Sequence, residues 1–221
     1  MLFRSSDWLA DKQHYQLTQY AADMTTLLAR LTADGASDIR WMGTSMGGMI
    51  GMILASLEYT PITRLVLNDI GIIIPRIALE RIAKYVGVLP TFKTLRELNL
   101  YVRMISAPFG PLSDEQWDHL TRHNARQNEQ GDWLLNYDPG IALPFQQGPL
   151  NEVDLSGYYD RITCPTLLLR GADSDLLLKD IAQNMTQRGP RARLVEFAGV
   201  GHAPMLMAPD QVEVVSSFLS S

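Results

Sequence analysis

The stretch Gly43-Thr44-Ser45-Met46-Gly47 decides how this chain of 221 residues is expected to fold. It follows DIRWM at 38–42, which predicts a short strand, and precedes GMIGMILA at 48–55, which predicts a buried helix. A sharp turn between a strand and a helix exposes the hydroxyl of its central serine at the end of the strand. We expect both flanking glycines to be required, because a Cβ at either position would clash with the tightly packed turn.

Ser45 is therefore the candidate nucleophile of a nucleophile elbow, the turn that G-x-S-x-G forms in this context. The alternative is an ordinary strand–helix turn in which Ser45 only caps the helix. The helix that follows directs its free N–H groups and the positive end of its dipole toward the serine. The backbone N–H of Met46 is the first candidate donor to an oxyanion.

The composition is that of one globular domain with an ordinary hydrophobic core. Hydrophobic residues make up 46% and charged residues 19% of the chain, and the net charge is −5. No cluster of lysine and arginine stands out, so we expect no nucleic-acid partner. Cys164 is the only cysteine, which excludes an internal disulfide and favours a reducing, cytoplasmic location. No apolar run reaches transmembrane length and residues 1–7 lack the apolar segment of a signal peptide, so no membrane association is expected.

Strand and helix patterns alternate toward both ends of the chain. An amphipathic helix is predicted over 15–33 and a second strand over 64–69. Toward the C-terminus the alternation resumes with strands at 165–171 and 191–197 and helices at 176–187 and 209–219. Alternating units of this kind predict an α/β fold with a mostly parallel sheet and helices on both faces.

Residues 71–157 interrupt this alternation. Their patterns predict helices at 77–86, 91–106 and 113–129, separated by prolines and glycines, and no strand. We interpret this segment as a helical lid that is inserted into a core formed by residues 1–70 and 158–221.

Several polar residues directly follow predicted strands. Because the carboxyl ends of parallel strands meet at one edge of a sheet, we expect a site there that is formed by Ser45, Asp69, Asp173, Asp175 and His202. A serine hydroxyl needs a base to accept its proton, and His202, in a glycine-rich loop after the last strand, is the best candidate.

The competing histidines are His14, His119 and His123. His119 and His123 lie four residues apart on a predicted helix, where they could be read as a metal-binding pair. No glutamate or cysteine cluster accompanies them, so we interpret them as solvated side chains and expect neither a metal nor another cofactor.

The chain order serine, acid, histidine resembles that of the α/β-hydrolase superfamily. The resemblance extends from about residue 3 to the C-terminus, and the stretches that carry it are 43–48, 67–71, 165–171, 199–202 and 209–210. The chain is most similar to the lidded branch that includes small serine esterases, acyl-thioester hydrolases and C–C bond hydrolases. The resemblance implies a catalytic triad in which an acid orients the histidine.

The resemblance leaves the identity of this acid open. Most members of the superfamily place it three residues after the glycine that here is Gly171, but that position holds Ser174, which has no carboxylate. Some lidded members place it after the preceding strand, in a stretch similar to Asn68-Asp69-Ile70-Gly71. We favour Asp69 and keep Asp175 and Asp173 as alternatives, although a helix cap also explains Asp175.

One departure concerns the N-terminus. Members of the superfamily usually begin with several strands whose loops supply a second oxyanion donor, and nothing here corresponds to them. We therefore expect an N-terminally truncated version of the fold, whether those strands lie upstream, are lost or come from a partner. Loss of one oxyanion donor typically costs about 10²–10³ in rate. An open sheet edge would favour a homodimer.

The function expected from these residues is that of a serine hydrolase cleaving a small carboxylic ester or thioester through an acyl-enzyme. One alternative is a C–C bond hydrolase on the same triad, in which Arg76, Arg81 or Arg103 would hold a substrate carboxylate. Another is a non-catalytic member of the fold that binds a ligand or a partner. The sequence does not identify the acyl substrate, because the segment expected to build the pocket is the one with the weakest patterns.

Overall fold

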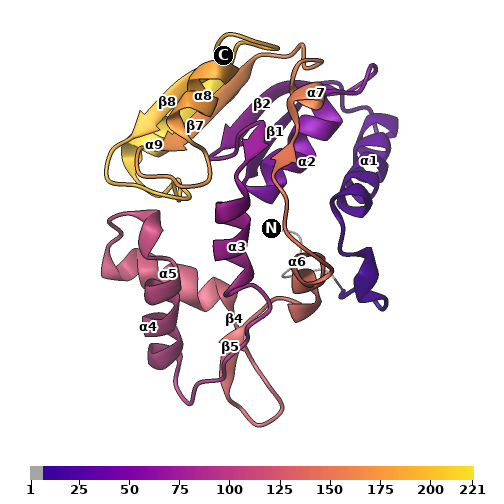
Figure 1. Cartoon of the computed structure of the whole chain (residues 1–221). Helices are drawn as coiled ribbons and strands as arrows, with labels where there is room; N and C mark the ends of the chain where they lie inside the picture. The colour runs from indigo at the N-terminus through magenta and orange to yellow at the C-terminus, as the bar shows by residue number, and fades with distance from the viewer. Residues whose placement is uncertain (1–6) are drawn as a thin grey trace.

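The centre of the protein is a four-stranded parallel sheet, seen in a computed structural model that describes residues 7–221 (Figure 1). Its strands are β1 (Ile39–Thr44), β2 (Ile62–Asn68), β7 (Thr166–Gly171) and β8 (Arg193–Phe197), in the order β1-β2-β7-β8. Each neighbouring pair is parallel. The α/β class with a mostly parallel sheet is therefore confirmed. Residues 1–6, on which the expectation of no signal peptide partly depends, lie outside the described residues.

Helices cover both faces of this sheet. Because successive side chains of a strand point to opposite faces, one strand contributes to an apolar cluster on each side. On β2, Leu65 and Leu67 belong to a cluster with helices α1 (Leu17–Ala33), α2 (Met46–Ala55) and α8 (Lys179–Met185). Val66 points to the other face, where it packs with Val215 and Phe218 of α9 (Pro209–Ser220). Every residue of β7 is buried, which agrees with a strand that has three successive leucines at its centre and is covered on both sides.

The segment between β2 and β7 contains three longer helices and a separate apolar cluster. The helices are α3 (Arg76–Ala83), α4 (Leu95–Ile105) and α5 (Asp114–Asn124). Leu98 and Val102 of α4 pack on Trp117 of α5. Capping boxes formed by Thr94 with Glu97 and by Ser113 with Gln116 start α4 and α5, so the two boundaries have a local chemical cause.

The prediction that residues 71–157 contain no strand is wrong. The segment contains two short antiparallel pairs, β3 (Ile73–Ile74) with β6 (Val153–Asp154) and β4 (Ala125–Gln127) with β5 (Trp133–Leu135). The predicted helix at 113–129 ends at Asn124 because the chain turns there into β4.

The remaining elements are short and complete the connections. They are the 3₁₀ turns η2 (Lys12–His14), η3 (Ala107–Phe109) and η4 (Pro139–Ala142), and the one-turn helices α6 (Leu143–Gln146) and α7 (Ser156–Tyr159). In Figure 1, α4, α5, β4 and β5 lie together at the end of the molecule opposite α8 and α9. Among residues 7–221, no helix has the length and apolar character that crossing a membrane requires.

Candidate active site

Ser45 stands between the end of β1 and the start of α2, in a strained backbone conformation. Its φ is 52° and its ψ is −121°, a region that residues with a Cβ rarely adopt. Strain of this kind persists only where the surrounding structure holds it and is concentrated at functional sites. Trp41 of β1 contributes to this support by donating from its Nε1 to the carbonyl of Gly47, at 3.0 Å.

The glycines around Ser45 have different roles. A Cβ on Gly43 would lie 2.2 Å from the backbone carbon of Gly47, and one on Gly48 would lie 2.4 Å from Cγ2 of Ile70. A Cβ on Gly47 would meet no atom within 4 Å. The expectation that both glycines of the motif exclude a side chain is therefore wrong for Gly47, and the second close approach belongs to Gly48.

His202 lies beside Ser45, although 157 residues separate them in sequence. Its Nε2 is 3.0 Å from Ser45 Oγ, and its Nδ1 is 2.8 Å from Oδ2 of Asp69. The histidine side chain is 11% exposed, whereas Asp69 is fully buried. Three side chains from the ends of β1, β2 and β8 therefore form one hydrogen-bonded line.

The Asp69 carboxylate is surrounded by donors. Oδ1 accepts the backbone N–H of Gly171 at 2.8 Å, and Oδ2 accepts the hydroxyl of Ser174 at 2.6 Å as well as the His202 ring. Burial of a carboxylate is costly unless hydrogen bonds replace its hydration, and here three donors do so. Asp69 also has a positive φ, of 53°, in the left-handed region that residues with a Cβ adopt uncommonly.

The two alternative acids flank Ser174 in sequence, but neither is hydrogen-bonded to His202 within the described residues. The Asp175 carboxylate accepts two hydrogen bonds from the guanidinium of Arg81 in α3, at 2.5 and 2.8 Å, and its side chain is half exposed. Asp173 is exposed, and its backbone N–H donates to the carbonyl of Val200. Within the described residues, the His202 ring shares a hydrogen bond with the Asp69 carboxylate and with neither alternative acid.

The other histidines are exposed, and in the described part of the chain none is hydrogen-bonded to Ser45, His202 or Asp69. His14 lies 3.9 Å from the Asp11 carboxylate, and the rings of His119 and His123 contact each other with centroids 4.1 Å apart. Within residues 7–221, no group of three or more histidine, cysteine, aspartate or glutamate side chains is arranged to hold a metal ion.

The backbone N–H of Met46 is available at the serine. Met46 is the first residue of α2, and the first N–H groups of a helix have no carbonyl partner one turn earlier. The positive end of the α2 dipole adds to the local field. An oxygen that carries negative charge beside Ser45 would be stabilised there.

Two residues that support the site were missed by reasoning from the sequence. Asn68, fully buried, donates from Nδ2 to the carbonyl of Pro204 at 2.8 Å and to Thr44 Oγ1 at 2.9 Å, which ties the His202 loop to β1 and β2. For Ser174, the sequence indicates only that the position has no carboxylate. A polar residue directly after the apolar run Leu65-Val66-Leu67 is the available signal for Asn68.

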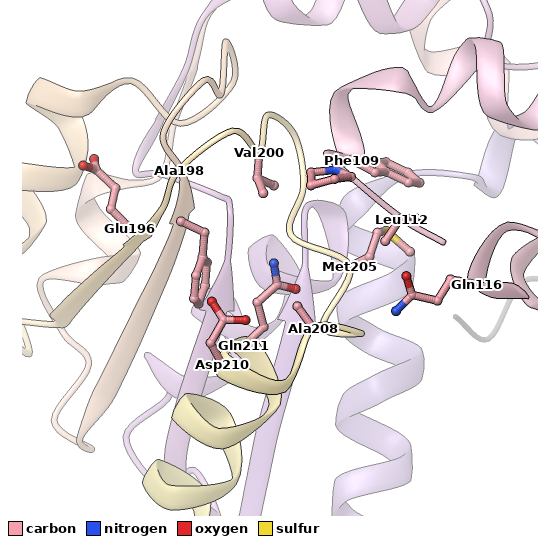
Figure 2. A pocket seen from close by; sticks show the side chains of 12 residues that line it. Phe109, Leu112, Gln116, Glu196, Ala198, Val200, Met205, Ala208, Asp210 and Gln211 are labelled. Carbon is pink, nitrogen blue, oxygen red and sulfur yellow. The ribbon is translucent and has the colours of Figure 1, made fainter. Parts of the chain in front are cut away.

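A pocket lies beside the loop that carries His202, next to Val200 and Met205 (Figure 2). Its volume is about 330 Å³, and the loop contributes Val200 and Met205 to its lining. Phe109 and Leu112 contribute from the segment between β2 and β7, and Gln211 contributes from α9. A hydrogen bond of 2.7 Å from the N–H of Gly201 to the carbonyl of Pro108 links the same two parts. The loop that positions His202 is therefore in direct contact with the inserted segment.

Comparisons with known proteins agree with this architecture. Residues 5–215 match the model of the Alpha/beta hydrolase family. The chain is 40% identical to the 3-hydroxybutyrate-oligomer hydrolase of Cupriavidus necator, over 97% of this chain and 75% of that protein. It is 27% identical to the pimeloyl-[acyl-carrier protein] methyl ester esterase of Photobacterium profundum, over 90% of this chain and 78% of that protein.

A solved structure shows the same relationship in three dimensions. The crystal structure of an alpha/beta hydrolase from Novosphingobium aromaticivorans superposes with a TM-score of 0.86 and 33% sequence identity. The match covers 98% of this chain and 76% of the other. The chain therefore belongs to the alpha/beta hydrolase family of enzymes.

Proposed function

We propose that the protein is a serine hydrolase that cleaves a small carboxylic ester or thioester through an acyl-enzyme. The observation that carries the proposal is the line of hydrogen-bonding distances from Ser45 Oγ to His202 Nε2 and from His202 Nδ1 to Asp69 Oδ2. A serine hydroxyl becomes an effective nucleophile when a base accepts its proton, and the base needs a third group to hold its tautomer.

In the proposed reaction, His202 accepts the Ser45 proton while Oγ attacks the substrate carbonyl carbon. The carbonyl oxygen becomes an oxyanion, which accepts a hydrogen bond from the N–H of Met46. His202 then donates its proton to the departing alcohol or thiol, leaving the acyl group on Ser45. A water molecule, deprotonated by His202, attacks this ester, and His202 then returns the proton to Ser45 Oγ as the acid departs. Asp69 stabilises the imidazolium cation at both stages.

We further propose short hydroxyacyl esters as the first substrates to test. The Cupriavidus necator relative is named for hydrolysis of 3-hydroxybutyrate oligomers, and oligomers of a hydroxy acid are joined by ester bonds. A second relative is named as a methyl ester esterase. Both names describe attack on an ester carbonyl, which is the chemistry that the Ser45 environment supports.

The alternative of C–C bond hydrolysis has less support. It requires a free cation to hold a substrate carboxylate, and the three candidates already have carboxylate partners. Arg76 lies 3.3 Å from Glu80, Arg81 2.5 Å from Asp175 and Arg103 2.6 Å from Asp114.

The test is rapid-mixing kinetics with a chromogenic butyrate ester, combined with intact-protein mass spectrometry. We expect a burst of chromophore, an adduct of one acyl group per chain, and loss of both in Ser45→Ala. Dimers and trimers of 3-hydroxybutyrate and a pimeloyl methyl ester then rank the substrates by kcat/KM. Hydrolysis without an adduct on Ser45, or turnover that persists in Ser45→Ala, would refute the acyl-enzyme. A folded protein that binds esters without cleaving them would favour the non-catalytic alternative.

A further inference from the structure

Ser174 lies behind the Asp69 carboxylate, in the turn that follows β7. Ser174 is 6% exposed, and its Oγ is 2.6 Å from Oδ2 of Asp69. The backbone N–H groups of Leu176 and Leu177 donate to the same Oγ, at 3.2 and 3.1 Å. This hydroxyl therefore has three partners, and all of them are protein groups.

The direction of the bond to Asp69 follows from these contacts. A serine hydroxyl has one proton to donate and two lone pairs that accept. The N–H groups of Leu176 and Leu177 occupy the two lone pairs, so the proton is directed at the carboxylate. The bond is charge-assisted, and such bonds are among the stronger ones in proteins.

Oδ2 of Asp69 receives both the Ser174 hydroxyl and the His202 ring, whereas Oδ1 receives the N–H of Gly171. Without Ser174, a single backbone donor would hold the far side of the carboxylate, and Oδ2 could move relative to His202 Nδ1. The Ser174 hydroxyl also shares the negative charge on Oδ2 with the imidazole. It therefore acts on both the orientation and the strength of the Asp69–His202 contact.

The backbone holds Ser174 in place for this task. Its N–H donates to the carbonyl of Gly171 at 3.0 Å, and the N–H of Asp173 donates to the carbonyl of Val200 at 2.9 Å. The next residue, Asp175, is bound by Arg81 of α3. The turn is thus attached to β7, to the His202 loop and to the inserted segment.

We propose that Ser174 is a positioning residue, which fixes the Asp69 carboxylate so that His202 keeps its proton on Nδ1 and presents Nε2 to Ser45. This inference rests on the proposed function, because it assigns Ser174 a role in the same reaction. Ser174 contacts neither Ser45 nor His202 in the hydrogen bonds of the described residues, so it acts through Asp69.

The variant that tests this role is Ser174→Ala, with Ser56→Ala as the matched control. Ser56 is also buried, at 7% exposure, and its hydroxyl donates to the carbonyl of Ile53, remote from the site. Loss of a hydrogen bond to a charged group predicts a fall of about ten- to a hundredfold in kcat for a chromogenic ester, with a smaller change in KM. In Ser174→Ala, the negative charge on Oδ2 is no longer shared with a second donor and interacts with His202 alone. The acidic limb of the kcat/KM profile should therefore move to higher pH.

Ser56→Ala should keep the wild-type rate and pH profile, and Ser174→Thr, which retains a hydroxyl, should restore the wild-type acidic limb. A Ser174→Ala enzyme within about threefold of the wild-type kcat, or one whose acidic limb is unmoved, would overturn the proposal. If Ser174→Ala does not fold, Ser174→Cys makes the same test, because a thiol fills similar space and donates only weakly.

A readout independent of turnover separates this inference from the proposed function. The proton between His202 Nδ1 and Asp69 is expected as a low-field ¹H resonance, whose position depends on the geometry of that contact. We expect Ser174→Ala to shift it and Ser56→Ala to leave it in place. An unshifted resonance refutes the positioning role, whereas absence of ester hydrolysis in the wild type refutes the proposed function alone.

Discussion

Replacement of Asp69 by asparagine separates the proposed triad from the alternatives most sharply. Asparagine has the shape of aspartate, but one carboxylate oxygen becomes an NH₂ group. We expect the amide oxygen to face the N–H of Gly171, because that backbone donor is fixed in place whereas the Ser174 hydroxyl can rotate its proton away. The NH₂ group then takes the place of Oδ2, which is 2.8 Å from His202 Nδ1 and 2.6 Å from Ser174 Oγ.

This arrangement forces His202 into the wrong tautomer. To accept from the new NH₂ group, Nδ1 must lose its proton, so Nε2 carries it and can no longer accept the proton of Ser45. In a comparable triad this change lowers kcat about 10⁴-fold, which corresponds to about 5 kcal/mol of activation free energy. The Ser174 hydroxyl also loses its acceptor, so the free energy of unfolding should fall by about 1–3 kcal/mol.

The assay is kcat for a chromogenic ester, with the melting temperature measured on the same samples to establish folding. Asp175→Asn is the matched control, because Asp175 is bound to Arg81 and is half exposed. We expect it to retain kcat within about threefold, since exposed ion pairs contribute little. An Asp69→Asn enzyme that retains a tenth or more of the wild-type kcat, or an Asp175→Asn enzyme that loses as much as Asp69→Asn, would refute the assignment.

Three further predictions concern folding and stability. Gly43→Ala should destabilise the protein by about 3 kcal/mol or more, because its Cβ would lie 2.2 Å from the backbone of Gly47. Gly47→Ala should unfold in urea at or above the wild-type midpoint, because its Cβ would meet no atom within 4 Å. The same urea midpoint for the two variants would contradict this prediction. Arg81→Ala should lower the free energy of unfolding in urea by less than about 1 kcal/mol, and a larger loss would mean that its partly exposed pair with Asp175 is a major attachment. Burial raises the pKa of Tyr159 to about 12, from 10.0, so the unfolded chain loses this proton at lower pH than the folded protein. The free energy of unfolding should therefore fall as pH rises from 10 toward 12. In Tyr159→Phe, urea titrations should show a shallower fall with pH, and the same dependence on pH as in the wild type would contradict the prediction.

The parts of the fold that could be predicted from the sequence are those with strong local patterns. The three successive leucines of β7 and the small-residue helix α2 indicate a covered parallel sheet. The closing helix was predicted at 209–219 and ends at Ser220. In each case neighbouring residues carry the signal, and the long-range structure agrees with it.

The short strands of the inserted segment could not be predicted in this way. β3 and β6 contain two residues each, too few for a periodic pattern, and they pair across most of the segment. The same limit applies to the glycines around Ser45. The motif marks Gly47, but the side chain that needs space beside Gly48 belongs to Ile70, beyond β2.

The site shows the same division between local and long-range information. Asp69 and Asp175 both follow strands, so position alone could not choose between them. The choice depends on which carboxylate meets His202 and which meets Arg81, and the latter pair is 94 residues apart in sequence. Ser174 was undetectable as a partner of Asp69 for the same reason, because 105 residues separate them.

Active-site labelling with a fluorophosphonate tests the central claim most directly. The claim is that the His202 imidazole activates the Ser45 hydroxyl, from which it lies 3.0 Å away. We expect stoichiometric phosphonylation of Ser45, identified by peptide mass spectrometry, its loss in Ser45→Ala, and labelling of His202→Ala that is slower by a factor of about 10³ or more. Labelling of another residue, or His202→Ala labelled at the wild-type rate, would contradict the account.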